Sequence, residues 1–208
     1  MAVSKRKRPA PKRNYSTFEQ ILEKGARQGY IPAKTQTGRD WFRDIAKSTT
    51  TTGAKLMASE KSALTGKIEI GRMYAFFYDP KHKKTLPYYD RFPLIFPFDN
   101  ASGGFMGINL HYLPYVLRAK LMDELYSLSS KKTYNEKTKL RLSYDILNGA
   151  AKFKYFKPCI KHYLNGHVQS RFLEVGADKW DIALFLPVEK FAKKGKDSVW
   201  SDSRRLVK

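Results

Sequence analysis

The chain has 208 residues, long enough for one buried domain with an extension or for two small domains. Its hydrophobic content of 42% and aromatic content of 14% are too high for a wholly disordered protein. Lys and Arg number 40 against 19 Asp and Glu, and this formal net charge of +21 predicts a polyanionic or acidic partner, nucleic acid first. A single cysteine, Cys159, excludes an internal disulfide and a cysteine-based zinc cluster, and no apolar run is long enough to span a membrane.

The N-terminus is a dense basic segment. Its first thirteen residues, MAVSKRKRPAPKR, carry six positive charges and no negative one. Pro9 and Pro11 disfavour helix, and nothing apolar would hold the segment against a core, so we expect a flexible arm that contacts a polyanion. The predicted contact residues of this arm are Lys5, Arg6, Lys7, Arg8, Lys12 and Arg13.

The next part of the chain is polar with one apolar island. Residues 15–30, YSTFEQILEKGARQGY, predict a short amphipathic helix with a serine or threonine cap. Residues 31–66 hold few large apolar groups apart from the island at Trp41 and Phe42. We therefore expect residues 1–66 to be an extended basic arm with one short helix, which becomes ordered when that island docks on a partner.

Three segments then predict a small antiparallel sheet. Residues 68–78 are rich in β-branched and aromatic types, 92–98 form a proline-limited strand expected at an edge, and 105–112 follow a glycine turn. The sequence KHKK lies between the first two segments and is expected to form a basic hairpin tip. The predicted polyanion contacts of this tip are Lys81, Lys83 and Lys84.

Leucines at helical spacing follow the sheet, and two short apolar runs come after them. The expected elements in chain order are helices at 114–128, 136–149 and 158–165, strands at 170–175 and 181–186, and a short helix from Pro187. We thus expect an α+β fold with a small antiparallel sheet, of an SH3-like and partly closed barrel type, and three to four helices. The folded domain is expected at 67–194, and residues 195–208 are expected to be a mobile basic tail.

No residue pattern points to catalysis. The four histidines lack metal-ligand spacing, and no glycine-rich phosphate loop opens a predicted helix. Asp79, Asp90 and Asp99 have the composition of a metal-dependent nuclease site, but turn formation explains them better. We expect no enzyme activity, no cofactor, no metal ion and no small-molecule substrate.

Cations and aromatic rings alternate in two places. Tyr88 and Tyr89 adjoin the KHKK tip, and residues 152–157, KFKYFK, alternate lysine with aromatic rings. Such surfaces bind nucleic acid by phosphate pairing and base stacking. The alternative for the second segment is that Phe153 and Phe156 face the core and the lysines form a solvated rim. The residues assigned here are Lys152, Lys154 and Lys157 as polyanion contacts, with Trp41, Phe42, Tyr88 and Tyr89 as partner-docking groups.

Several segments carry a family resemblance. RMYAFFYDPKHKKTLPYYDRFPLIFPF and GGFMGINLHYLPYVL, together with TKLRLSYDIL and FKPCIKHYL, resemble a virion protein of T-even-like tailed bacteriophages. The resemblance covers residues 68–205 and leaves the first 66 outside it. It implies the DNA end-protector class, which caps packaged genome ends and helps close the head, or else a baseplate or tail-hub component.

Three functions therefore remain open on the sequence. The first is a non-enzymatic virion component, assembled in the host cytoplasm, whose basic arms bind double-stranded DNA at a genome end. The second is a baseplate or tail-hub protein whose arm threads between neighbouring virion proteins and meets acidic surfaces there. The third is a metal-dependent nuclease. None of the three involves a membrane.

Overall fold

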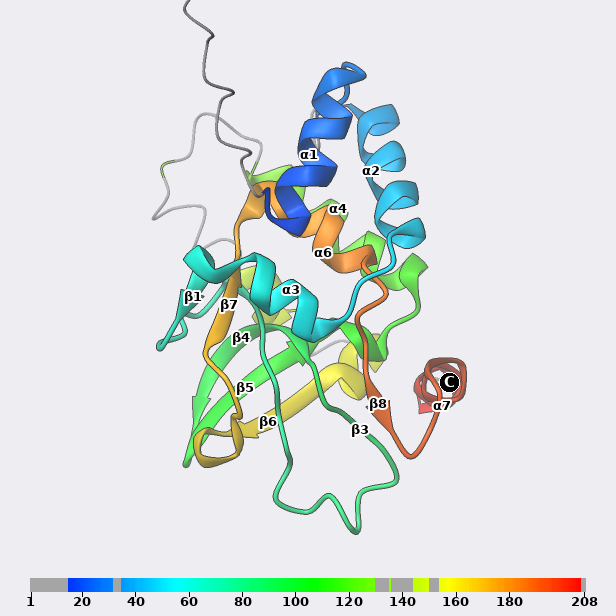
Figure 1. The fold of residues 1–208 in the computed structure, drawn as a ribbon. Helices are drawn as coiled ribbons and strands as arrows, with labels where there is room; N and C mark the ends of the chain where they lie inside the picture. The colour runs from blue at the N-terminus through cyan, green and yellow to red at the C-terminus, as the bar shows by residue number, and fades with distance from the viewer. Residues whose placement is uncertain (1–14, 32–34, 130–134, 136–143, 150–153, 207–208) are drawn as a thin grey trace, which may run out of the picture.

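The computed structural model describes residues 15–31, 35–129, 135, 144–149 and 154–206. Helices lie above a curled antiparallel sheet, and a two-stranded ribbon stands beside it (Figure 1). The longer helices are α1 (Thr17–Arg27), α2 (Gln36–Ser48), α3 (Gly53–Ser59), α4 (Tyr115–Ser129), α6 (Trp180–Phe185) and α7 (Lys196–Leu206). The 3-10 turns are η1 (Lys61–Ala63), η2 (Leu110–Tyr112), η3 (Lys154–Cys159), η4 (Asn165–His167) and η5 (Ala177–Lys179).

The six-stranded sheet has the strand order β1-β7-β2-β4-β5-β6, and the two-stranded ribbon pairs β3 with β8. The strands are β1 (Leu64–Thr65), β2 (Met73–Ala75), β3 (Tyr89–Asp90), β4 (Leu94–Ala101), β5 (Gly104–Asn109), β6 (Ile160–Leu164), β7 (Phe172–Val175) and β8 (Phe191–Ala192). Every pairing is antiparallel. The expected mixture of helices and an antiparallel sheet is confirmed, whereas no closed barrel is formed by the described strands.

The helix expected at 15–30 is confirmed as α1. Ser16 caps it, because its hydroxyl accepts the backbone N–H of Glu19 at 3.2 Å while the Glu19 carboxylate accepts the N–H of Ser16 at 2.9 Å. This reciprocal capping box satisfies two backbone donors that a helix start leaves open. Phe18 and Ile21 then point into the core.

Residues 31–66, expected to order only against a partner, include two more helices that pack on the rest of the chain. The apolar side chains of α2 recur at helical spacing, and Phe42 and Ala46 are fully buried in the main core cluster. Leu56 and Met57 of α3 join the same cluster. A narrow stripe of apolar groups is therefore enough to place this polar segment within the fold.

The strand expected at 92–98 is present as β4 but lies inside the sheet, between β2 and β5. Its prolines had suggested an edge. Pro97 is tolerated because the regular pairing with β2 ends before it, and its carbonyl accepts a bond from the backbone N–H of Gly71 at 3.0 Å. A register shift between Pro97 and Asp99 then bends the strand.

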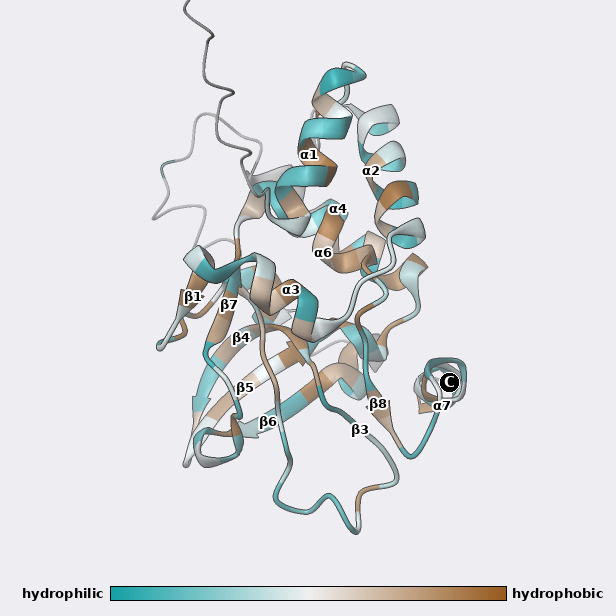
Figure 2. Cartoon of the chain, in the orientation of Figure 1, coloured by the Kyte–Doolittle hydropathy of each residue, from teal (hydrophilic) through white to brown (hydrophobic). Residues whose placement is uncertain are grey.

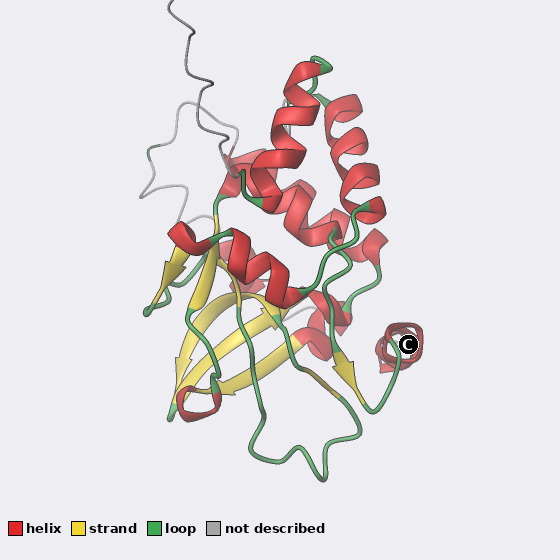
Figure 3. Ribbon diagram, viewed as in Figure 1, coloured by secondary structure: helices red, strands yellow, loops and turns green. Residues whose placement is uncertain are grey.

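The sheet buries both of its faces. Alternate side chains such as Met73 and Leu94 face the helices, while Tyr74 and Ile95 face a second cluster rich in aromatic rings. The sheet curls around this second cluster (Figure 3). The ring of Phe76 therefore contacts rings from three other strands: Phe105 of β5, Tyr163 of β6 and Phe172 of β7. β1 and β6 stay at the two ends of the order, so the curl remains open.

Several expected elements after residue 113 change type. The helix at 114–128 is confirmed as α4, and residues 144–149 are helical, while 136–143 lie outside the described residues. The strand at 170–175 is confirmed as β7. The helix expected at 158–165 is wrong, because this segment forms β6 and pairs with β5 along its length.

The strand expected at 181–186 is also wrong, since α6 occupies this position. All of its residues are buried, so the apolar run shows no period from which helix and strand could be separated. Figure 2 shows this helix as apolar along most of its length. The helix expected from Pro187 is replaced by β8, and the tail expected to be mobile holds α7, which buries Val199 and Trp200. Among the described helices, none is both long and apolar enough to cross a membrane.

Candidate nucleic-acid interface

The KHKK sequence lies in a long loop between β2 and β3, which we call the basic loop (residues 79–88). The loop extends beyond the ribbon on the side away from α1 and α2 (Figure 1), and most of its residues carry the hydrophilic colour in Figure 2. It folds on itself through turn bonds from the N–H of Lys83 to the carbonyl of Pro80 and from the N–H groups of Thr85 and Leu86 to the carbonyl of His82. The expected basic tip is thus a compact series of turns rather than the end of a two-stranded hairpin.

The ribbon joins the basic loop to a distant part of the sequence. Tyr89 pairs with Ala192 and Asp90 with Phe191, and the backbone N–H of Arg91 donates to the carbonyl of Lys190 at 2.8 Å. Lysines that are about a hundred residues away in sequence therefore lie beside the loop. We use the name basic face for the exposed cations of the basic loop and of the residues next to the two ribbon strands: Lys81, Lys83, Lys84, Arg91, Lys190, Lys193 and Lys194.

The cations of the basic face differ in how they are neutralised. Lys83 binds Asp79 at 2.6 Å, and Lys194 binds Asp202 at 2.7 Å. The hydrogen bond from Lys83 to Asp79, strengthened by their opposite charges, raises the pKa of the Lys83 ammonium. The exposed cations of this face whose side chains neither form an ion pair with the described residues nor bond a backbone carbonyl there are Lys81, Lys84, Arg91 and Lys190. These four present uncompensated charge to solution, as a phosphate-binding surface requires.

Tyr88 and Tyr89, predicted to dock a partner, are half-buried at the foot of the loop. The ring of Tyr88 lies 6.0 Å from that of Tyr112, and the ammonium of Lys194 sits 5.1 Å from its centroid. Burial, followed by the charge of Asp202, raises the pKa of the Tyr88 phenol. These contacts hold Tyr88 within the chain, so only part of its ring faces solvent.

Trp41 and Phe42 also make contacts inside the chain. Trp41 stacks on Tyr30 with centroids 5.3 Å apart, and Phe42 is fully buried against the α1 backbone at Gly25. The island that was expected to dock a partner is thus occupied by the packing of α2 on α1.

The remaining predicted contacts are dispersed. Lys154 belongs to η3 and Lys157 is exposed, while Phe156 packs on the main core, in line with the alternative of a solvated lysine rim. The positions outside the described residues are Lys5, Arg6, Lys7, Arg8, Lys12, Arg13 and Lys152.

A buried hydrogen-bond network centred on Asp90 lies beneath the two-stranded ribbon. The sequence did not predict it. One oxygen of Asp90 accepts the N–H groups of Phe92 at 3.0 Å and Lys190 at 3.3 Å, and the other accepts Asn109 at 3.2 Å and His111 at 2.7 Å. Burial alone would raise the pKa of Asp90, but the attraction and hydrogen bond of His111, with the bonds from Phe92 and Asn109, hold it below the usual value. No local signal predicts this network, because its members come together only when β3, β5 and η2 pack.

The three aspartates weighed for a nuclease do not form a joint site. Asp79 pairs with Lys83, Asp90 is buried with His111, and Asp99 is exposed on β4, where it accepts the N–H of Asn100. Within the ranges that the structure describes, no three His, Cys, Asp or Glu side chains gather in a way that could hold a metal ion.

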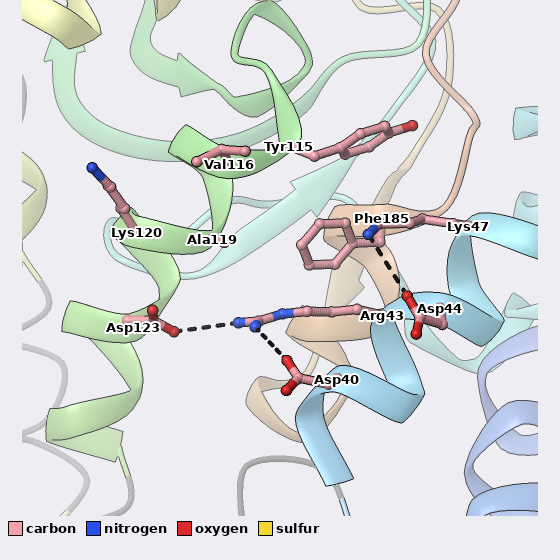
Figure 4. A pocket seen from close by; sticks show the side chains of 10 residues that line it. All are labelled: Asp40, Arg43, Asp44, Lys47, Tyr115, Val116, Ala119, Lys120, Asp123 and Phe185. Atoms are coloured by element: carbon pink, nitrogen blue, oxygen red, sulfur yellow. Dashed lines mark hydrogen bonds and ion pairs between the residues drawn. The ribbon is translucent and has the colours of Figure 1, made fainter. Parts of the chain in front are cut away.

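A pocket of about 480 Å³ lies between α2 and α4, with Phe185 of α6 in its wall (Figure 4). Arg43 bridges Asp40 at 3.3 Å and Asp123 at 3.2 Å. Lys47 lies 5.0 Å from the ring centroid of Phe185. Because carboxylates alternate with cations here and pair with them, the pocket offers no concentrated positive charge to a polyanion. The basic face is the better candidate.

A family model described as the phage T4 terminal DNA protecting protein matches residues 12–204. The chain belongs to this family. The predicted resemblance to the DNA end-protector class of T-even-like phages is therefore confirmed, and the match reaches well into the N-terminal segment that had been left outside it. No curated protein and no solved structure shows significant similarity to the chain.

Proposed function

We propose that the chain binds the ends of double-stranded phage DNA and shields them from degradation, as a component of the virion. Membership of the terminal DNA-protecting family carries this proposal, and the basic face supports it. Lys81, Lys84, Arg91 and Lys190 are exposed and have no acidic partner among the described residues, so they are free to neutralise the phosphates of duplex DNA.

The basic residues that precede position 14 extend the same proposal. Six Lys and Arg side chains in the first thirteen residues would add further phosphate contacts. Head closure at the genome end, and contacts with other virion proteins there, belong to this proposal as well. The family description, which concerns DNA termini, favours a genome-end role over a baseplate or tail-hub role.

The proposal is tested with the full chain and one plasmid in two forms. The linearised plasmid should resist a double-strand-specific exonuclease when the protein is present, and the bound fraction should fall steeply with salt. Each phosphate contact contributes a slope of about 0.9 in log affinity against log salt. The closed circular form measures binding that does not depend on an end.

A matched pair of variants locates the surface. The first replaces Lys81, Lys84, Arg91 and Lys190 by Met. The control replaces four exposed lysines that lie outside the basic face and form no ion pair with the described residues: Lys24, Lys55, Lys61 and Lys67. Both variants lose the same net charge, so a difference between them reports where the charge lies. We expect only the first variant to lose end protection. Absence of binding at low salt would refute the proposal, and equal losses in the two variants would remove the basic face from it.

A further inference from the structure

Lys193 has an uncommon backbone conformation at the edge of the basic face. Its φ of 71° is the one positive value among the described non-glycine residues. For a residue with a Cβ this left-handed conformation is unfavourable, and positions that need it usually carry glycine or asparagine. Contacts elsewhere must therefore hold Lys193 in place.

The Lys193 side chain supplies such contacts. Its ammonium donates to the carbonyl of Lys84 at 2.9 Å and to that of Leu86 at 2.6 Å. Charge-assisted hydrogen bonds of this kind are stronger than neutral ones. The ammonium of Lys193 is thus engaged by two backbone oxygens of the loop.

Among the described residues outside the loop, the other side chain that bonds its backbone is His167, whose Nδ1 lies 2.8 Å from the carbonyl oxygen of Asp79 at the start of the loop. The start of the loop is also tied down by the bond from the N–H of Asp79 to the carbonyl of His167, and its end by the pairing of β3 with β8. Between these ties, the remaining hydrogen bonds of residues 80–87 stay inside the loop or connect Lys83 with Asp79. The two hydrogen bonds of the Lys193 ammonium thus join the middle of the basic loop to the ribbon, and we call this connection the clasp.

We propose that Lys193 is a positioning residue of the DNA interface. It holds the basic loop in an ordered conformation before DNA binds, so that Lys81 and Lys84 are in place to contact phosphates. This inference rests on the proposed function. A loop ordered before binding loses less conformational entropy on the DNA, which strengthens binding without any new contact. The Lys193 charge remains uncompensated by acid and adds to the local positive potential.

The test compares Lys193→Met with Lys190→Met, which removes the same charge from the residue before β8, at the other end of that strand from Lys193. Limited trypsin digestion of the free protein, followed by mass spectrometry, reports cleavage after Lys81, Lys83 and Lys84. We expect this cleavage to rise about tenfold in Lys193→Met, the effect of losing roughly one to two hydrogen bonds, and to stay unchanged in Lys190→Met. Affinity for linear DNA should fall further in Lys193→Met than in Lys190→Met.

A second variant separates the clasp from the backbone conformation. Lys193→Gly accepts the positive φ without strain but cannot bridge the loop, so it should reproduce the behaviour of Lys193→Met with an unchanged circular dichroism spectrum. Equal tryptic cleavage of the loop in wild type and both Lys193 variants would overturn the clasp. Equal affinity losses in Lys193→Met and Lys190→Met would overturn its role in binding. Since the digestion needs no DNA, it still tests the clasp if the wild type fails to bind.

Discussion

Nδ1 of His111 lies 2.7 Å from Oδ2 of Asp90, with both side chains almost fully buried. The pair connects the ribbon to η2, because the other oxygen of Asp90 accepts the N–H of Lys190 and the carbonyl of His111 accepts the indole N–H of Trp200 at 2.8 Å. A buried carboxylate is tolerated only when its hydrogen-bonding capacity is filled, as it is here. The carboxylate of Asp90 beneath the ribbon is therefore satisfied, whereas Nε2 of His111 is buried without a hydrogen-bond partner among the described residues.

The low pKa of Asp90 predicts sensitivity to acid. A carboxylate whose pKa is lowered by folding stabilises the protein above the pKa of the unfolded chain, about 3.9, and this contribution is lost as the pH falls through the folded value. In urea titrations, the free energy of unfolding of the wild type should fall as the pH is lowered from about 6 to about 3. Asp90→Asn should be less stable at neutral pH by about 3 kcal/mol and show a flatter acid limb. Asn at the exposed Asp44 serves as the control, and an unchanged acid limb in Asp90→Asn would contradict the prediction.

We expect substitution of Arg118 to destabilise the protein strongly as well. Its guanidinium is fully buried and donates to the carbonyls of Leu113, Leu184 and His111 at 2.7, 3.0 and 3.2 Å. Burial lowers the pKa of this group, and its planar fork is matched to three acceptors in a way that lysine is not. Arg118→Lys should lower the free energy of unfolding by about 2 kcal/mol or more. Lysine at the exposed Arg204 is the control, and equal melting temperatures would refute the argument.

The sequence predicted those parts of the fold whose signals are local. Ser16 and Glu19 mark the start of α1 within one turn of helix, and the turn with two glycines before β5 is equally local. The stripe around Phe42 was also present in the sequence, but its spacing was overlooked because the segment is so polar. By contrast, α6 lies wholly in the interior, so burial hides the period that would identify it as a helix.

The candidate site likewise has one part that the local sequence predicts and another part that it does not predict. The KHKK sequence located the basic loop, since charge next to an Asp-Pro turn is visible locally. The pairing of Asp90 with Phe191 brings Lys190 and Lys193 to that loop across a hundred residues, and nothing in either segment encodes the other. A contact of that sequence separation depends on the whole fold.

Gly25 tests the packing of α2 on α1. A Cβ at this position would overlap the ring of Phe42, whose Cε1 lies 2.9 Å from where the new atom would stand. The overlap should outweigh the better helix propensity of alanine, so Gly25→Ala should destabilise the protein by about 1–3 kcal/mol. Gly66→Ala, where no atom lies within 4 Å, is the control for the same chemical change. A more stable Gly25→Ala would mean that the two helices do not pack this closely.

Cys159 offers a direct probe of opening in the core. The thiol is fully buried, and burial raises its pKa to about 12. Because the thiolate is the reactive form, a disulfide reagent should leave the native protein unlabelled at pH 8 and react rapidly once urea unfolds it. The readout is the absorbance of the released thiol. Complete labelling of the native protein within seconds would contradict this burial.

Charge pairing on the basic face predicts which lysines contact DNA. Lys84 is unpaired, whereas Lys83 already binds Asp79 at 2.6 Å and must give up that partner to meet a phosphate. Lys84→Met should therefore reduce the slope of log affinity against log salt by about 0.9, and Lys83→Met should reduce it much less. The measurement is a salt titration with linear DNA, and Lys55→Met outside the basic face should leave the slope unchanged. A larger reduction for Lys83→Met than for Lys84→Met would show that the Asp79 pair opens on binding, and that free charge does not select the contacts.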